Sequence, residues 1–163
     1  MKQISMAATD LVEVQCPACR AKQDVLLTNS INVTTNPEEK EMVIAGTVNY
    51  FRCRSCSYEG HIATSLFYHD MGKKFCACYI PPENLDDAEY VRHIFTRNAK
   101  INLMLPGDEE PPAEAAYVSD AHIVFSLPEL SRYVLFRDRI DALFAGDGSA
   151  PQNTILKDSD GIT

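Results

Sequence analysis

Two short cysteine motifs, Cys16-Pro17-Ala18-Cys19 and Cys53-Arg54-Ser55-Cys56, decide how the N-terminal part of this chain folds. They are separated by the 33 residues 20–52. Each C-x-x-C motif can form a tight knuckle that points two sulfur atoms at one ion, and two knuckles complete a tetrahedron. Four thiolates leave no coordination position open for a substrate. The pattern therefore predicts one structural Zn²⁺ bound by Cys16, Cys19, Cys53 and Cys56.

Three other uses of these cysteines compete with zinc. The 163-residue chain has six cysteines, which in a secreted protein would suggest three disulfides. The first ten residues lack an apolar segment and a cleavage signal, so we expect a cytoplasmic protein with reduced thiols. A redox C-x-x-C needs only one of the two motifs, and this knuckle pattern favours zinc over an iron–sulfur cluster.

The residues between and after the motifs alternate between strand and helix signals. Residues 23–35 are rich in β-branched residues and predict extended chain, and Asn36-Pro37 starts a predicted helix over 37–45 that Gly46 stops. The other elements expected in this part are strands over 47–52 and 60–67, a turn over 68–73, and a strand over 74–80 that Pro81-Pro82 ends.

The C-terminal half predicts mostly helices. A helix is expected over 85–98, a linker over 106–116 and a strand over 117–125. Ser126-Leu127-Pro128-Glu129 has the form of a capping box, which predicts a helix to about residue 144. The apolar side expected for this helix consists of Leu130, Tyr133, Val134, Phe136, Ile140 and Leu143.

These elements predict an α+β fold with two lobes. The first, residues 11–82, would be a zinc-ribbon and β-hairpin lobe with an inserted short helix. The second, residues 83–145, would be an acidic, helix-rich α/β lobe, and residues 146–163 a flexible tail. The two lobes together also fit a single domain over 11–145. No apolar run approaches the ~18 residues that span a bilayer, so no membrane association is expected.

Charge is distributed unevenly and bears on the partner. The net charge is −8. Residues 1–80 carry eight basic and eight acidic residues, whereas residues 81–163 carry seven basic and fifteen acidic ones. An acidic chain is repelled by phosphate backbones unless a basic patch offsets the charge. The balance favours a protein partner, of unknown identity, over nucleic acid.

Two further groups of residues are candidates for chemistry. Cys76 and Cys78 fall on one face of a predicted strand and are interpreted as small buried residues, with a second metal site or a reactive dithiol as the alternatives. His69-Asp70 could form a catalytic dyad with Cys76 or Cys78 as the nucleophile. A turn with a hydrogen-bonded histidine is favoured, because the strand is expected to place the cysteines away from the turn. The three other histidines, His61, His93 and His122, are isolated and are expected on the surface or in packing.

Basic residues close to the knuckles support a second function class. Arg20, Lys22, Arg52 and Arg54 could contact phosphates, or could offset the charge of a tetrathiolate zinc. No phosphate-binding loop, serine-hydrolase elbow or metalloprotease motif is present. Three hypotheses follow: a non-enzymatic protein-interaction or adaptor domain, a nucleic-acid-binding zinc ribbon, and a thiol enzyme around His69, Asp70 and Cys76. The first is favoured.

The order of several segments resembles the CpXC family, whose domains are named for their cysteine motifs. The resemblance covers residues 11–145 and rests on these segments: the two C-x-x-C motifs, Ala45-Gly46, Phe67-Tyr68-His69-Asp70, Pro81-Pro82 and Val124-Phe125-Ser126-Leu127-Pro128-Glu129-Leu130.

The resemblance implies an α+β domain with a zinc ribbon and supplies no function, because the family is uncharacterised. Arg54 stands where the family often has proline, and Arg20 and Ser57 stand where it usually has glycine after each knuckle. These last two departures predict either strain in the turns or a change in how their backbone amides meet the sulfur atoms.

Overall fold

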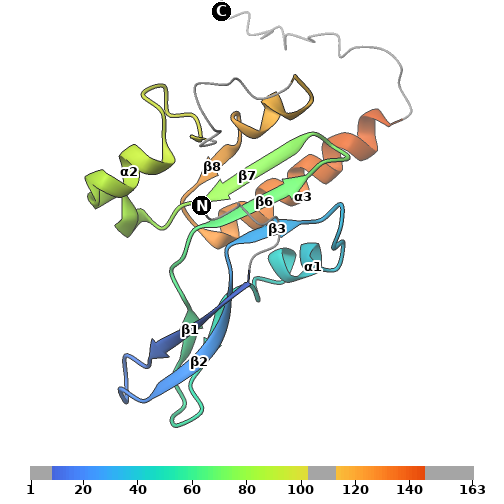
Figure 1. Ribbon diagram of the computed structural model, residues 1–163. Coiled ribbons are helices and arrows are strands. Elements are labelled where there is room, and N and C mark those ends of the chain that lie inside the picture. Colours follow the sequence, from blue (N-terminus) through green and yellow to red (C-terminus); the bar gives the residue numbers. More distant parts are fainter. Residues whose placement is uncertain (1–8, 103–112, 146–163) are drawn as a thin grey trace, which may run out of the picture.

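Three small sheets and three α-helices make up the computed structural model, which describes residues 9–102 and 113–145 (Figure 1). The predicted α+β class is confirmed. Two hairpins form the cysteine-bearing end: β1 (Thr9–Gln15) with β2 (Lys22–Thr28), and β4 (Tyr50–Arg52) with β5 (Glu59–His61). In Figure 1 this end projects from the rest of the molecule.

A four-stranded mixed sheet forms the body. Its strands are β3 (Ser30–Asn32), β6 (Leu66–Asp70), β7 (Phe75–Tyr79) and β8 (His122–Val124), in the order β3-β6-β7-β8. Strands β6 and β7 form the antiparallel hairpin that the sequence predicts, whereas β3 and β8 are parallel to their neighbours. The parallel pairs join segments far apart in the chain.

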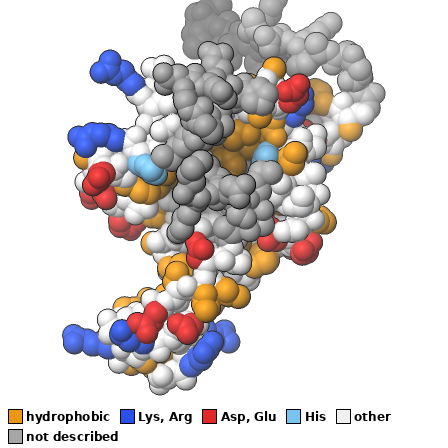
Figure 2. All heavy atoms as spheres, in the orientation of Figure 1, with side chains coloured by type: hydrophobic (Ala, Val, Ile, Leu, Met, Phe, Trp, Pro, Cys, Tyr) orange, Lys and Arg blue, Asp and Glu red, His pale blue; other side chains and the backbone are white. Residues whose placement is uncertain are grey.

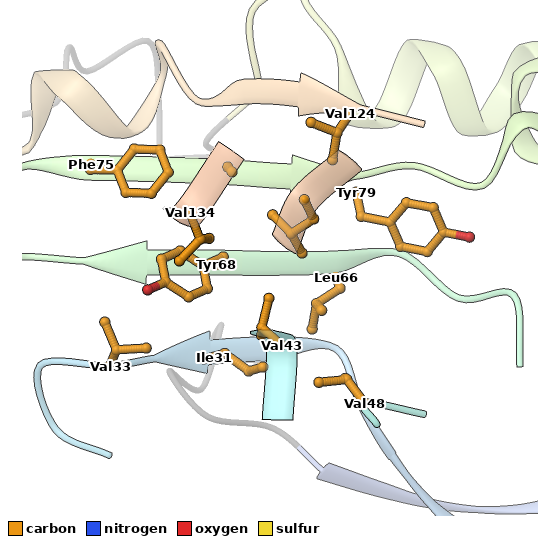
Figure 3. Packing of buried hydrophobic residues seen from close by; sticks show 12 residues of the cluster. Ile31, Val33, Val43, Val48, Leu66, Tyr68, Phe75, Tyr79, Val124 and Val134 are labelled. Carbon is orange, nitrogen blue, oxygen red and sulfur yellow. The ribbon is translucent and has the colours of Figure 1, made fainter. Parts of the chain in front are cut away.

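The main core lies between this sheet and helix α3 (Leu127–Phe144). Leu130 and Val134 of α3 belong to one buried cluster with Tyr68, Ala77 and Val124 of the sheet. Figure 3 labels Val134, Tyr68 and Val124 of this cluster. Burying such side chains removes a large apolar area from water and supplies the main stabilisation of the body. Helix α1 (Glu39–Ile44) joins the same core through Val43.

The N-cap predicted for α3 is confirmed, and the Glu129 carboxylate bonds the residue before the cap instead of the cap itself. The Ser126 hydroxyl accepts a hydrogen bond from the Glu129 backbone amide at 3.2 Å, and the Glu129 carboxylate accepts one from the Phe125 amide at 2.9 Å. The broad apolar face predicted for this helix is narrower than expected. Phe136 and Leu143 are 52% and 55% exposed, because the four-stranded sheet contacts only one side of the helix.

Helix α1 is shorter than the predicted 37–45. It begins at Glu39. Asn36 instead begins a turn, in which the Asn36 carbonyl accepts a hydrogen bond from the Glu39 amide at 3.1 Å. Its end is as predicted, because Gly46 adopts the left-handed conformation with φ of 67°. A short 3-10 helix, η1 (Pro82–Asp86), and α2 (Ala88–Ile94) replace the single helix predicted over 85–98, and Asp87 caps α2.

The strands predicted over 60–67 and 117–125 differ from those in the structure. The strand predicted over 60–67 is divided between β5, which belongs to the cysteine-bearing end, and β6, which belongs to the body. Strand β6 continues to Asp70, so the turn occupies residues 71–74 rather than 68–73. The strand predicted over 117–125 is a 3-10 helix, η2 (Ala113–Val118), followed by β8.

The predicted lobes share one sheet. Strands β3, β6 and β7 come from before residue 82 and β8 from after it. The domain ranges 11–82 and 83–145 stay a prediction. The tail over 146–163, and residues 106–112 of the predicted linker, lie outside the described residues. No helix in the described part of the chain is long and apolar enough to cross a membrane.

Candidate metal centre

The first knuckle is the loop that joins β1 to β2. The Cys16 amide donates to the Ala21 carbonyl at 2.8 Å, and the Arg20 amide donates to the Cys16 carbonyl at 2.9 Å. These bonds fold residues 16–21 back on themselves, so Cys16 and Cys19 point the same way. Arg20 has φ of 62°, the left-handed conformation that favours glycine, which confirms the strain predicted for this position.

The second knuckle joins β4 to β5 in a similar way. The Cys53 amide donates to the Tyr58 carbonyl at 2.9 Å and continues the β4–β5 ladder up to the loop. The Ser55 amide approaches the Cys53 sulfur at 3.4 Å, and the Tyr58 amide approaches the Cys56 sulfur at the same distance. Backbone amides that donate to sulfur stabilise thiolates. Ser57 is not among the described residues with positive φ, so strain is absent there.

The two knuckles face each other and bring four sulfur atoms together. The Sγ atoms of Cys16 and Cys56 are 3.7 Å apart, those of Cys19 and Cys53 are 3.6 Å apart, and all four lie within 4.8 Å of one another. None of these cysteines is in a disulfide. Cys16 and Cys53 are buried, Cys56 is half-buried and Cys19 is exposed. The predicted ligand set is therefore assembled, and this geometry could hold a metal ion.

A small hydrophobic cluster fixes the relative position of the two hairpins. Phe51 of β4 is buried together with Cys16 and Cys53, and Val14, Val25, Cys56 and Ile62 pack against them. The cluster is separate from the main core under α3. With so few apolar side chains, these hairpins gain little from burial alone.

Without a metal, the thiols of Cys16 and Cys56 would have different pKa values. Burial disfavours the Cys16 thiolate, but hydrogen bonds from the Cys19 and Ala18 amides and from neighbouring thiols lower its pKa to about 7. The hydrogen bond from the Tyr58 amide lowers the pKa of Cys56, but burial and the three neighbouring thiols together raise it to about 12. Such a cluster readily exchanges its protons for a cation.

The second cysteine pair lies elsewhere. Cys76 and Cys78 are buried in β7, as predicted for small core residues. Burial raises the pKa of each thiol to about 12, with Cys78 and Asp70 adding to the effect at Cys76. A buried thiol with a high pKa is a poor nucleophile.

His69 and Asp70 end strand β6 instead of lying in a turn, which corrects their predicted position. The expected turn chemistry is nevertheless present, because the Asp70 carboxylate accepts from the Lys73 amide at 3.1 Å. His69 Nε2 lies 2.7 Å from the Tyr117 hydroxyl. Cys76 is directly opposite His69 in the hairpin register.

Two of the four basic residues near the knuckles are already paired. Lys22 lies 2.6 Å from Glu13, and Arg52 lies 3.1 Å from Glu59. Within the described part of the chain, no carboxylate lies at ion-pair distance from Arg20 or Arg54. The surface around the knuckles is therefore less basic than these four residues alone suggest.

The remaining histidines lie where they were expected, on the surface or in packing. His61 Nε2 is 2.7 Å from the Gly46 carbonyl oxygen, His122 stacks on Tyr133, and His93 is exposed.

Sequence reasoning missed two side-chain amides that connect the hairpins. Asn49 donates to the Thr28 carbonyl and accepts from the Thr28 amide, both at 2.8 Å. Gln23 donates to the Arg52 carbonyl at 3.1 Å and accepts from the Arg54 amide at 2.9 Å. The only sequence signal for Asn49 is that asparagine tolerates the left-handed conformation, which it adopts here with φ of 55°.

The comparison with known families agrees with the order of motifs. The model of the CpXC protein family matches residues 14–141, which include both knuckles, the four-stranded sheet and most of α3. No curated protein and no solved structure gives a significant match. The chain belongs to the CpXC family.

Proposed function

We propose that the four cysteines bind one Zn²⁺ as a structural ion, and that the chain acts as a non-enzymatic protein-interaction or adaptor domain. The assembled sulfur cluster carries the proposal. In a tetrahedral site with Zn–S distances of ~2.3 Å, the sulfur atoms lie about 3.8 Å apart. The separations of 3.6 and 3.7 Å between the knuckles are close to this value and far from the ~2.05 Å of a disulfide.

A structural role follows from the number of ligands. Four protein thiolates would fill a tetrahedral shell and leave no position for water or substrate. The ion would connect residues 16–19 with 53–56 and compensate for the small cluster around Phe51. The proposal assumes a reducing compartment such as the cytoplasm, where the thiols stay available to the metal.

Two observations support an interaction role over catalysis. Cys76 is buried with a raised pKa, and the ring nitrogen of His69 faces Tyr117 rather than a thiol. A thiol nucleophile needs a lowered pKa and a base within hydrogen-bond reach. The thiol-enzyme hypothesis therefore has no support from this arrangement.

The nucleic-acid hypothesis is weakened by charge. Of the four basic residues near the knuckles, Lys22 and Arg52 are neutralised by Glu13 and Glu59. The chain as a whole carries −8, so little positive potential remains to attract a phosphate backbone.

Metal analysis tests the proposal first. Untagged protein and the Cys53→Ser variant would be analysed by mass spectrometry for metal, with circular dichroism before and after chelation. One zinc per wild-type chain, lost in the variant, is the expected result. Iron or no metal in the wild type would overturn the zinc assignment.

The role is tested separately. Pull-down from native cells with zinc-loaded protein should retain a protein partner that survives nuclease treatment. Retention of nucleic acid that weakens steeply with salt, and is lost in the Arg52→Glu and Arg54→Glu variants, would instead favour the nucleic-acid hypothesis.

A further inference from the structure

The outer edge of β2 has backbone groups that no neighbouring strand uses. β2 pairs only with β1 among the described strands. At Thr28 both the amide and the carbonyl bond the side chain of Asn49, so they point away from β1. In an antiparallel pair, residues two apart direct their backbone groups to the same side. The amides and carbonyls of Leu26 and Asp24 therefore also point away from β1.

The facing edge of β4 is open in the same way. Asn49 immediately precedes β4, and its carbonyl accepts from the Ile62 amide, next to β5, at 2.9 Å. The backbone groups of odd-numbered residues along this stretch therefore point towards β5. Tyr50 and Arg52 then face the other side, towards β2. The Arg52 carbonyl is taken by Gln23 and the Tyr50 amide by Thr47. In the described structure the Tyr50 carbonyl and the Arg52 amide have no such partner.

An open groove of about 530 Å³ lies between these two edges. Gln23 and Asn49 connect β2 with β4 at its two ends. The residues that line the groove include Leu11, Leu26, Tyr50, Arg52 and Arg54. The groove is thus lined by unused strand edges together with apolar and basic side chains.

The side chains of the groove combine an apolar surface with positive charge. Leu11 and Leu26 are cross-strand partners in β1–β2, yet they are 67% and 66% exposed. Figure 2 shows hydrophobic side chains on this projecting end, together with both basic and acidic ones. Of the charged lining residues, Asp24 is acidic, Arg52 is paired with Glu59 at 3.1 Å, and Arg54 has no carboxylate at ion-pair distance in the described part of the chain.

We infer that this groove binds an extended peptide with alternating acidic and apolar residues, which adds a strand to the outer edge of β2. The backbone groups of Asp24 and Leu26 would bond the peptide backbone, as in other strand-addition complexes. An apolar side chain would cover Leu11 and Leu26, and an acidic one would pair with Arg54. The inference deepens the proposed interaction function and rests on it.

Nuclear magnetic resonance can detect such binding even when it is weak. The probes are two synthetic hexapeptides of alternating glutamate and valine, one beginning with each residue, added to the zinc-loaded chain at up to about 5 mM. The expected result is a shift of the Asp24, Leu26 and Arg52 amide signals. A peptide with N-methylated backbone amides, or with lysine in place of glutamate, should bind at least about tenfold more weakly.

Surface variants separate the groove from unspecific attraction. Leu26→Asp and Arg54→Glu should each weaken binding at least about fivefold. Leu85→Asp and Arg92→Glu are matched controls, because both residues are exposed and neither lines the groove. They should leave binding unchanged.

Three outcomes would overturn the inference. The first is zinc-loaded protein whose groove amides do not respond to either peptide, which leaves the proposed metal site intact. The second is equal binding of the N-methylated peptide. The third is a single-stranded oligonucleotide that shifts the same amides more strongly and is displaced by salt. A chain that contains no zinc would instead overturn the proposed function, and the inference with it.

Discussion

Cys76 lies directly opposite His69 across the β6–β7 hairpin, but the His69 ring bonds the Tyr117 hydroxyl, at 2.7 Å from Nε2. A histidine and a cysteine, which often form a catalytic pair, are thus neighbours on the sheet, but the histidine bonds a tyrosine instead of the thiol. Burial lowers the pKa of His69, although Asp70 opposes the effect, and burial raises the pKa of Cys76 to about 12. Both shifts favour the neutral forms, which suit a core.

We therefore expect Cys76 and Cys78 to resist alkylation in the folded protein. A pKa about three units above the ordinary 9.0 lowers the thiolate fraction near neutral pH by roughly a thousandfold. The measurement is the rate of iodoacetamide labelling by mass spectrometry at pH 7.5, with a Leu26→Cys variant as an exposed reference thiol. Labelling of Cys76 as fast as the reference would contradict the prediction and revive the thiol-enzyme hypothesis.

Replacing Arg20 by glycine should stabilise the first knuckle. Arg20 has φ of 62°, where a side chain costs about 1 kcal/mol relative to glycine. We expect Arg20→Gly to raise the free energy of unfolding of zinc-loaded protein by about this amount, measured by urea denaturation. Ser57→Gly is the matched control after the second knuckle. Ser57 does not have positive φ, so this change should bring no gain.

The amide of Asn49 should contribute to the connection between the hairpins. Its two hydrogen bonds with Thr28 are part-buried, and their loss should cost about 1–3 kcal/mol. Asn49→Gly removes the amide and keeps the backbone free to adopt φ of 55°, and urea denaturation measures the resulting change in stability. A second change to glycine at positive φ measures the backbone contribution. Lys74→Gly, at φ of 47°, is the control and should be neutral or stabilising. Equal stability of both variants would show that the Asn49 amide is dispensable.

The local signals in this sequence were informative, whereas the long-range pairing was not. The spacing of the cysteines predicted the assembled sulfur cluster, and Ser126 with Glu129 predicted the start of α3, because both depend on a few neighbouring residues. The parallel pairing of β3 with β6, and of β7 with β8, joins segments separated by 30 residues or more, and no local pattern encodes it.

Exposure was also hard to predict from periodicity. Phe136 and Leu143 belong to the apolar pattern of α3, but the sheet is too narrow to cover them. His69 and Asp70 looked like turn residues because polar residues favour turns, and the structure instead continues β6 through them. Their polar groups are satisfied by Tyr117 and by the Lys73 amide, partners that become visible only in three dimensions.

Acid should weaken the contact between α3 and the rest of the body through Asp138. Its carboxylate lies 2.6 Å from Lys40 and 2.5 Å from Lys73. Burial opposes ionisation, but the two ammonium groups hold the pKa of Asp138 below its ordinary 3.8. The folded state then binds fewer protons than the unfolded chain, so the stabilisation is present above about pH 4 and is lost as the pH falls further.

We expect Asp138→Asn to lower the free energy of unfolding at pH 7 by up to about 1 kcal/mol, because solvent screens a partly exposed pair. The difference from wild type should narrow as the pH falls to about 3, in urea denaturation at several pH values. Asp120→Asn, which breaks the exposed pair with Lys100, should change stability little at any pH. A constant difference between Asp138→Asn and wild type would show that charge is not the cause.

Removing the metal should unfold one part of the chain and spare the other. The hairpins β1–β2 and β4–β5 depend on the few side chains around Phe51, whereas the body has its own core of twelve buried residues under α3. If zinc binding supplies folding free energy to the hairpins, chelation should remove it from them alone. Hydrogen exchange should then show lost protection in β1, β2, β4 and β5 and retained protection in β6, β7 and α3.

The Cys53→Ser variant should show the same pattern without chelator, and chelator should change it no further. Cys78→Ser is the matched control, because this cysteine is outside the cluster, and its hairpins should still respond to chelation. Loss of protection throughout the wild-type chain would mean that the body depends on the hairpins. Undiminished protection in the hairpins would mean that their hydrogen bonds and the Phe51 cluster suffice without an ion, and the proposed structural role of zinc would fail.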